Sequence, residues 1–144
     1  IQAQVVNLLM DLQERMGLAY LFIAHDLSVV RHISNRIAVM YLGQVVEIAT
    51  RDELFHDPKH PYTQALLAAV PVADPELEAS RPQQIITGEV PSVRDPPSGC
   101  HFHPRCPHAT DKCRQQEPKL VALEDGTHVS CHLFSDATAA SSAA

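Results

Sequence analysis

The segment "YLFIAHDLSVV", residues 20–30, is an apolar run that stops at a histidine and an aspartate. The apolar part extends from Leu18 to Ala24, which predicts a short strand buried on both faces of a parallel sheet. His25 would then stand at the carboxyl edge of that sheet, where open α/β folds bind ligands. The alternative is an ordinary surface histidine at the point where the strand reaches solvent. A single histidine carries too little specificity to separate the two readings.

The segments around this strand predict several helices and one hairpin. Apolar residues recur at helical spacing over residues 1–16, and Gly17 is a plausible helix stop. A short helix capped by Asp26 or Ser28 should follow, and then an antiparallel hairpin of 36–42 and 44–49 around Gly43. A Thr50–Glu53 capping box predicts a short helix that runs through Phe55. A last helix is expected over 61–70, starting at Pro61. This order indicates the end of an α/β domain.

The composition changes after Val70. Residues 71–99 hold more than half of the eleven prolines, with one short strand expected within 83–92. Residues 120–133 indicate a second hairpin with Asp125-Gly126 at its turn. We therefore expect four parts: an α/β unit over 1–70, a Pro-rich linker or arm over 71–99, a Cys-rich metal-binding or cluster-binding extension over 100–134, and a disordered tail over 135–144.

Composition and charge exclude several classes of protein. The 144 residues are 45% hydrophobic and carry a net charge of −6, which argues against a nucleic-acid partner. No apolar run approaches the roughly 20 residues of a membrane span, and no secretory signal is visible. The chain starts at Ile1, directly on a helical pattern without a cap. We interpret it as a fragment or processed chain whose functional machinery is partly missing.

Four cysteines lie in the last third of the chain with the spacing C-x5-C-x6-C-x17-C: Cys100, Cys106, Cys113 and Cys131. Without an export signal, a metal site is favoured over a disulfide framework. Structural zinc sites commonly use close C-x2–4-C pairs, which are absent here, whereas four thiolates can hold a [4Fe–4S] cluster. Five histidines nearby keep a mixed Cys/His zinc site open, and reduced thiols or a disulfide remain alternatives.

Three segments, taken together, resemble the end of an ABC transporter ATPase domain. Residues 2–49, which include the histidine after the apolar run and the hairpin "RIAVMYLGQVVEIA", resemble the region from the D-loop helix to the closing hairpin. "DPKHPYTQALLAAVP", residues 57–71, resembles the subfamily that imports di- and oligopeptides. "VPSVRDPPSGCHFHPRCPHATDKC", residues 90–113, resembles the C-terminal extension of that subfamily. The three occur in the expected order over about residues 1–134.

The resemblance implies an ATP-hydrolysing subunit of a bacterial ABC importer for di- and oligopeptides. His25 corresponds to the switch histidine, which contacts the ATP γ-phosphate and helps to position the attacking water. The implied partners are a second ATPase subunit in a head-to-tail dimer, transmembrane permease subunits and, indirectly, an extracytoplasmic peptide-binding protein. The implied location is the cytoplasmic face of the plasma (inner) membrane. In this subfamily, the Cys-rich extension is associated with an iron–sulfur cluster, and all four cysteine positions match.

The sequence also departs from the family pattern. It has no Gly-Lys pair and therefore no phosphate loop, and it lacks the signature motif and the carboxylates for Mg²⁺ and the general base. We therefore expect no ATPase activity from these 144 residues alone. Two other functions remain open: a non-enzymatic Cys-rich metal or iron–sulfur regulatory module, and an ABC ATPase for another substrate such as nickel.

Overall fold

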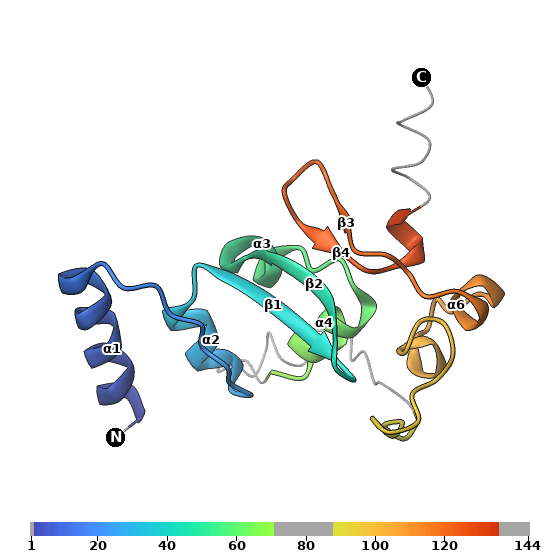
Figure 1. Cartoon of the computed structure of the whole chain (residues 1–144), viewed down its shortest axis with the longest axis horizontal. Helices are drawn as coiled ribbons and strands as arrows, with labels where there is room; N and C mark the ends of the chain where they lie inside the picture. The colour runs from blue at the N-terminus through green and yellow to red at the C-terminus, as the bar shows by residue number, and fades with distance from the viewer. Residues whose placement is uncertain (1, 71–87, 136–144) are drawn as a thin grey trace, which may run out of the picture.

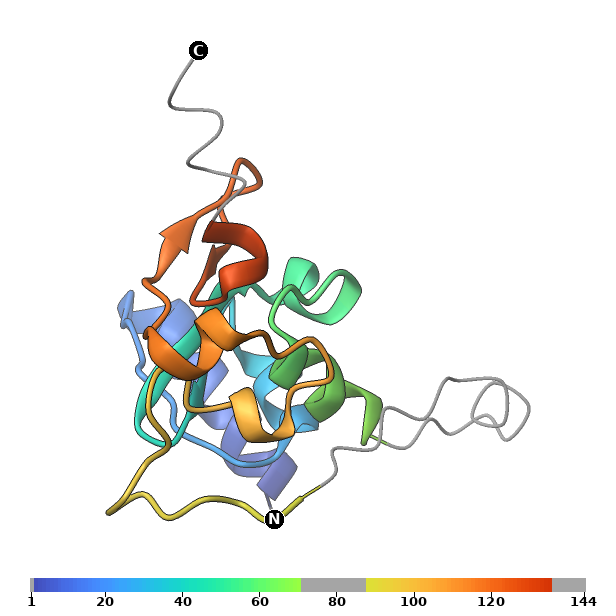
Figure 2. The same ribbon diagram turned by 90° about the vertical axis from the view of Figure 1, so that its right-hand side faces the viewer.

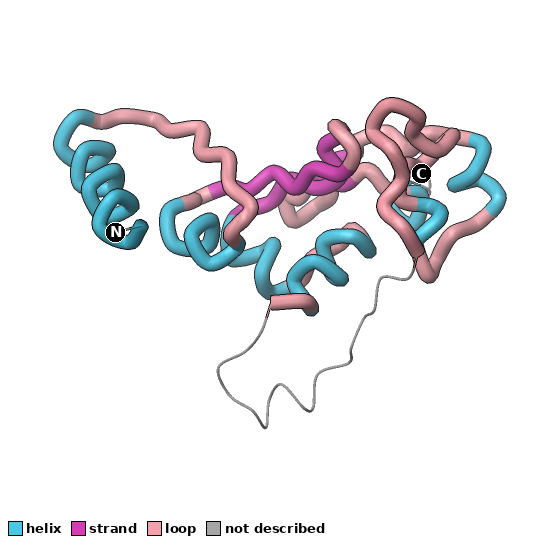
Figure 3. Tube along the Cα trace, turned by 90° about the horizontal axis from the view of Figure 1, so that it is seen from below, coloured by secondary structure: helices cyan, strands magenta, loops and turns pink. Residues whose placement is uncertain are grey.

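The computed structural model describes residues 2–70 and 88–135. A long antiparallel hairpin occupies its centre (Figure 1). Helix α1 (Gln2–Met16) lies beyond one end of this hairpin, and the Cys-rich segment lies at the other end, an arrangement that is also clear from below (Figure 3).

Helix α1 has the expected bounds but leaves most of its apolar stripe uncovered. It ends at Gly17, whose φ is +62°, and the amide of Leu18 donates to the Gln13 carbonyl at 3.2 Å. Val6 is buried, whereas Val5 and Leu8 are more than half exposed. Among the described residues, only one side of α1 therefore contributes to a packed face.

The strand predicted over residues 18–24 does not form, and that prediction is wrong for the described structure. The segment has no regular secondary structure, and Leu21 and Ile23 are 93% and 89% exposed. A strand needs a neighbouring strand for its backbone N–H and C=O groups. No strand within 2–70 or 88–135 pairs with this segment, so the apolar run remains extended and exposed.

Helix α2 (Leu27–Ile33) and the hairpin follow as predicted. Asp26 caps α2, because its Oδ1 accepts from the amides of Ser28 at 2.9 Å and Val29 at 3.3 Å. Strands β1 (Arg36–Tyr41) and β2 (Gln44–Thr50) pair antiparallel around a tight turn at Leu42 and Gly43, both with positive φ.

Helices α3 (Arg51–His56) and α4 (Pro61–Ala68) also begin where predicted, although α4 ends two residues before the predicted residue 70 and its cap was not predicted. Thr50 and Glu53 form the complete capping box of α3, with each side chain bonded to the other residue's amide. His60 caps α4, and its Nδ1 accepts from the Tyr62 amide at 3.0 Å. These two helices pack beside the hairpin (Figure 1).

The C-terminal part adds two short strands to the hairpin. It contains a 3-10 helix η1 (His103–Arg105), α6 (Asp111–Gln115), β3 (Val121–Ala122) and β4 (His128–Val129). The predicted turn at Asp125-Gly126 joins β3 to β4. Strand β4 pairs with β2, so the sheet has the order β1-β2-β4-β3 and every pairing is antiparallel.

The mixed helix and sheet content matches the α/β expectation, but the expected parallel sheet is replaced by this antiparallel one. Its edge strand β1 pairs with β2 alone. Residues 88–92 contain no strand, whereas the rest of the short strand expected within 83–92 lies outside the described residues. Most of the predicted arm and tail also lies outside them.

One hydrophobic core joins the hairpin to the Cys-rich segment. Tyr41 and Val46 of the hairpin, Leu54 of α3 and Phe102 are all buried, with Phe102 only 1% exposed. Turning the molecule shows the Cys-rich segment in front of the hairpin and α4 (Figure 2). The segment after residue 99 therefore shares the packing of residues 36–70 and does not fold around a core of its own.

Candidate functional site

His25 lies on an exposed bend between the uncovered apolar segment and α2. The next residue, Asp26, uses its side chain for the helix cap and so fixes the start of α2. The imidazole is consequently free to reach a ligand in solvent, as a phosphate-contacting histidine requires. The other predicted site residues, the four cysteines, lie away from His25, because α2 and α6 occupy opposite ends of the hairpin (Figure 1).

The four cysteines are brought together by backbone contacts within the C-terminal part. The Cys100 amide donates to the Cys113 carbonyl at 2.8 Å, which joins the loop before η1 to α6. Cys106 follows η1 directly, and Cys131 lies two residues beyond β4. All four are free thiols; Cys131 is buried and the other three are half-buried.

The four thiols also influence one another electrostatically. Burial, followed by smaller contributions from Cys100, Cys106 and Cys113, raises the pKa of Cys131 to about 11. Burial is likewise the main cause that raises the pKa of Cys100 and of Cys106. These thiols therefore keep their protons at neutral pH unless a cation stabilises the thiolates.

The four thiols do not form a closed site for a single metal ion in the described structure. Within residues 2–70 and 88–135, no group of three or more His, Cys, Asp or Glu side chains converges closely enough to hold a metal ion. A structural zinc ion needs four ligands at about 2.0–2.3 Å. The four cysteines lie in one part of the described structure, but they do not converge as such a set of ligands.

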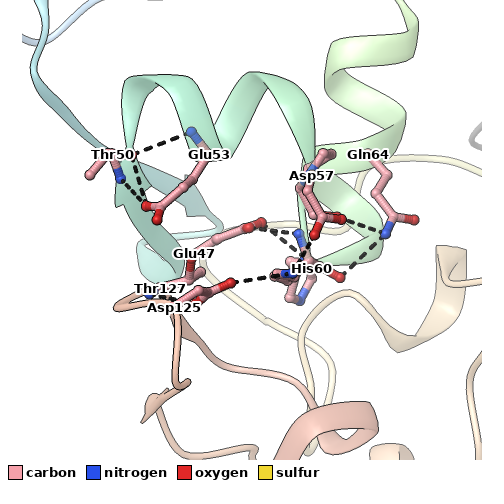
Figure 4. A network of polar contacts seen from close by, with 10 residues as sticks. Glu47, Thr50, Glu53, Asp57, His60, Gln64, Asp125 and Thr127 are labelled. Atoms are coloured by element: carbon pink, nitrogen blue, oxygen red, sulfur yellow. Dashed lines mark hydrogen bonds and ion pairs between the residues drawn. The ribbon is translucent and has the colours of Figure 1, made fainter.

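A buried polar network lies on the same face of the hairpin as the core, because Glu47 pairs with the core residue Val39, and sequence reasoning missed it. Glu47 in β2 is fully buried, and its carboxylate accepts from the amides of Lys59 at 2.7 Å and His60 at 2.9 Å (Figure 4). The register shift between Val39 and Met40 leaves Val46 as an extra residue in β2, so Val46 and Glu47 are both buried. The signal was present in the sequence as one acidic residue within "QVVEIA", because a charge inside an apolar strand needs a partner.

Lys59 extends this network to the second hairpin. Its ammonium group contacts Asp57 at 2.5 Å and Asp125 at 3.3 Å, and Asp125 also accepts from the Thr127 amide (Figure 4). The hydrogen bond that the Lys59 ammonium donates to Asp57 is the main cause that raises the pKa of Lys59. The Lys59 loop is thus fixed by Glu47 from β2 and by Asp125 from the β3–β4 turn.

No helix among the described residues is both long and apolar enough to cross a membrane.

The comparison with known proteins agrees with the resemblance of the three segments. Residues 46–113 match the family model described as "Oligopeptide/dipeptide transporter, C-terminal region". This match begins at the bulged part of β2 and ends at Cys113. It therefore includes Glu47, the α4 cap and three of the four cysteines.

Individual relatives extend the similarity to nearly the whole chain. The chain is 56% identical to the "Probable peptide ABC transporter ATP-binding protein y4tS" of Sinorhizobium fredii, over 97% of the chain and 39% of that protein. It is 58% identical to the oligopeptide transport ATP-binding protein OppF of Salmonella typhimurium, over 83% and 36%. It is 51% identical to AppF of Bacillus subtilis, over 94% and 41%. The chain thus spans about two-fifths of the length of these relatives, and over that part it is similar to the ATP-binding proteins of oligopeptide and dipeptide ABC transporters.

Proposed function

We propose that this chain forms part of the ATP-hydrolysing subunit of a bacterial importer for di- and oligopeptides. The observation that carries the proposal is the 56% identity to a peptide ABC transporter ATP-binding protein over 97% of the chain. The relatives reported above are named for peptides, which does not favour nickel or a separate metal-sensing module.

In this proposal, His25 acts on the γ-phosphate of ATP. Its exposed position beside a well-capped helix supports this role, because a histidine can donate one ring N–H while the rest of its element stays rigid. Phosphoryl transfer depends mainly on positioning and on electrostatic stabilisation of the transferred group. The phosphate loop, the Mg²⁺ ligands and the general base would come from residues other than these 144, so the chain alone does not hydrolyse ATP.

The subunit would work at the cytoplasmic face of the inner membrane. Its partners would be a second ATPase subunit arranged head to tail, the permease subunits and, indirectly, an extracytoplasmic peptide-binding protein. ATP binding closes such a dimer and hydrolysis reopens it, which moves the permease.

A chimaera tests the assignment to peptide import. This chain replaces the matching residues of the Sinorhizobium fredii relative, and peptide uptake is measured in cells that lack that relative. A control chimaera carries the matching segment of the Bacillus subtilis relative AppF. We expect both chimaeras to restore uptake. Restoration by the control alone would contradict the assignment.

The second part of the proposal is a [4Fe–4S] cluster held by Cys100, Cys106, Cys113 and Cys131. Two properties support it: the thiols are free, and they lie close enough to influence one another electrostatically. When bound, the cluster would replace their protons by Fe–S bonds and would join the loop before η1, α6 and the segment after β4.

Metal and sulfide analysis of protein purified without oxygen checks the cluster. We expect about four iron atoms and about four acid-labile sulfides per chain, as four thiolates permit. The Cys131→Ser variant should lose both, whereas the Ser130→Ala variant should keep them. Zinc without sulfide, or unchanged iron in Cys131→Ser, would rule out this ligand set.

A further inference from the structure

Three polar side chains meet where β1 ends, α4 begins and η1 ends. They are Tyr41, Tyr62 and Arg105. Tyr41 is only 5% exposed, and its hydroxyl is shielded from solvent without a hydrogen-bond partner. The Nε of Arg105 is also buried without a partner. Two buried donors thus have no acceptor within residues 2–70 and 88–135.

Tyr62 connects these two groups. Its ring centroid lies 4.7 Å from that of Tyr41, and both rings contact Phe102 at 5.3–5.5 Å. The Arg105 amide donates to the Phe102 carbonyl at 3.0 Å, so Arg105 follows directly from the residue whose ring both tyrosines contact. Burial raises the pKa of Tyr62, so its phenol keeps its proton at neutral pH.

An unpaired donor in this position is costly. A buried donor without a partner costs about 1–3 kcal/mol, and a charged one costs more. Among the described residues, Arg105 forms no ion pair with a carboxylate. In native proteins, a bound water or ligand is the usual partner of such a buried polar group. Tyr62 and Arg105 are only partly buried, so the group borders solvent.

The chemistry of the group selects the ligand. A guanidinium is a donor only, and two protonated phenols can both donate, so the missing partner is an acceptor with negative charge. The surrounding side chains are aromatic, so transferring a doubly charged ligand from water to this position would cost more free energy than transferring a singly charged one. The net charge of −6 also disfavours a dianion. We propose that Tyr41, Tyr62 and Arg105 form a binding site for a carboxylate. This site differs from the His25 region, borders the cysteine segment through Arg105 and Cys106, and does not depend on the proposed transport function.

NMR of the 144-residue chain tests the site directly. Acetate is the probe, added at constant ionic strength against chloride, and inorganic phosphate is the comparison. The Arg105 Nε–H signal and the ring signals of Tyr41 and Tyr62 are the readouts. We expect acetate to shift these signals with a saturating curve. The Nε–H of Arg94, whose residue is exposed, should not saturate.

Two variants complete the test. Tyr41→Phe keeps the ring packing and removes one donor, so it should weaken acetate binding by a factor of about 5. Arg105→Gln should abolish binding. Absence of a saturating shift would overturn the proposal in favour of bound water. Tighter binding of phosphate than of acetate, or unchanged affinity in Tyr41→Phe, would also overturn it.

Discussion

At the residue scale, Glu47 and His60 determine how the loop before α4 is attached to the sheet. Glu47 accepts from two consecutive amides of that loop, and the second belongs to His60. The His60 ring then accepts from the Tyr62 amide and packs against Phe102 at 5.8 Å. Because its Nδ1 accepts, the neutral ring carries its proton on Nε2. One buried carboxylate and one neutral histidine thus link β2, α4 and the Cys-rich segment.

His60 makes stability depend on pH. Burial lowers its pKa from 6.5 to about 4, so the unfolded chain takes up this proton first as the pH falls. Above pH 6.5 the residue adds no pH dependence, and between pH 6.5 and 4 the folded state loses about 3 kcal/mol through it. We expect His60→Asn, which keeps a cap acceptor, to remove this part of the pH dependence of urea unfolding. The control His32→Asn, at an exposed position, should retain the full pH dependence of the free energy of unfolding. The same dependence on pH in wild type and His60→Asn would contradict the assignment of this effect to His60.

Glu47→Gln tests the carboxylate. The amide side chain can accept from one backbone N–H but presents its NH2 group to the other. One buried donor is then unpaired, at a cost of about 1–3 kcal/mol. Urea unfolding should show this loss. Glu124→Gln, at an exposed position of the β3–β4 turn, should change stability by less than about 0.5 kcal/mol. Similar values for the two variants would mean that the Glu47 contacts contribute little.

At the element scale, local signals in the sequence were sufficient wherever a cap or a turn fixes the backbone. Asp26, the Thr50–Glu53 capping box and the turn at Gly43 were all identified from neighbouring residues, and the structure confirms them. The pairing of strands that lie far apart in the sequence leaves no such local signal in the residues of either strand. The contact of β4 with β2 joins residues about 80 positions apart through two pairs, Glu47 with Val129 and Ile48 with His128. The strand predicted over 18–24 failed for the same reason, because its partner cannot be read from its own residues.

The candidate site shows the same limit. The sequence and the family resemblance identified His25 and the four cysteines by residue type, but not how the cysteine segments approach one another. That approach depends on Gly99, where a Cβ atom would lie 2.4 Å from the Cys113 carbonyl oxygen. The sequence presents Gly99 only as one more glycine in a Pro-rich stretch.

Gly99→Ala should therefore disturb the Cys-rich segment specifically. Gly99 has φ +67°, so alanine meets both the left-handed backbone cost of about 1–2 kcal/mol and a clash with rigid backbone. Gly126→Ala is the matched control, because Gly126 has φ +83° with nothing within 4 Å of its Cβ position. Urea unfolding should show a larger loss for Gly99→Ala than for Gly126→Ala. Equal losses would mean that α6 moves away at little cost.

At the scale of the whole molecule, the two proposed functional regions are far apart. His25 precedes α2 at one end of the hairpin, whereas the cysteines lie around η1, α6 and the end of β4 (Figure 3). The region between them is the hairpin core, which includes Phe102 from the Cys-rich segment. Changes at the cysteines should thus affect ATP turnover only through stability, whereas changes at His25 should affect turnover without affecting stability.

Most of the large exposed apolar side chains lie on α1 and on the segment 18–23 that leads to His25. Leu21 and Ile23 are almost fully exposed, and β1 is an edge strand whose Met40 is 57% exposed. Long apolar edges favour association with other chains.

The most direct test of the central claim is the ATP turnover of the chimaera with the Sinorhizobium fredii relative, measured for three forms. These are the unchanged chimaera, its His25→Ala variant and its His32→Ala variant, which changes an exposed histidine of α2. Removing a group that contacts the γ-phosphate should lower kcat by about 100-fold or more while nucleotide binding is retained. The His32→Ala variant should turn over ATP like the unchanged chimaera. Full turnover in His25→Ala, with unchanged ATP binding, would contradict the assignment of His25 as the histidine that acts on ATP.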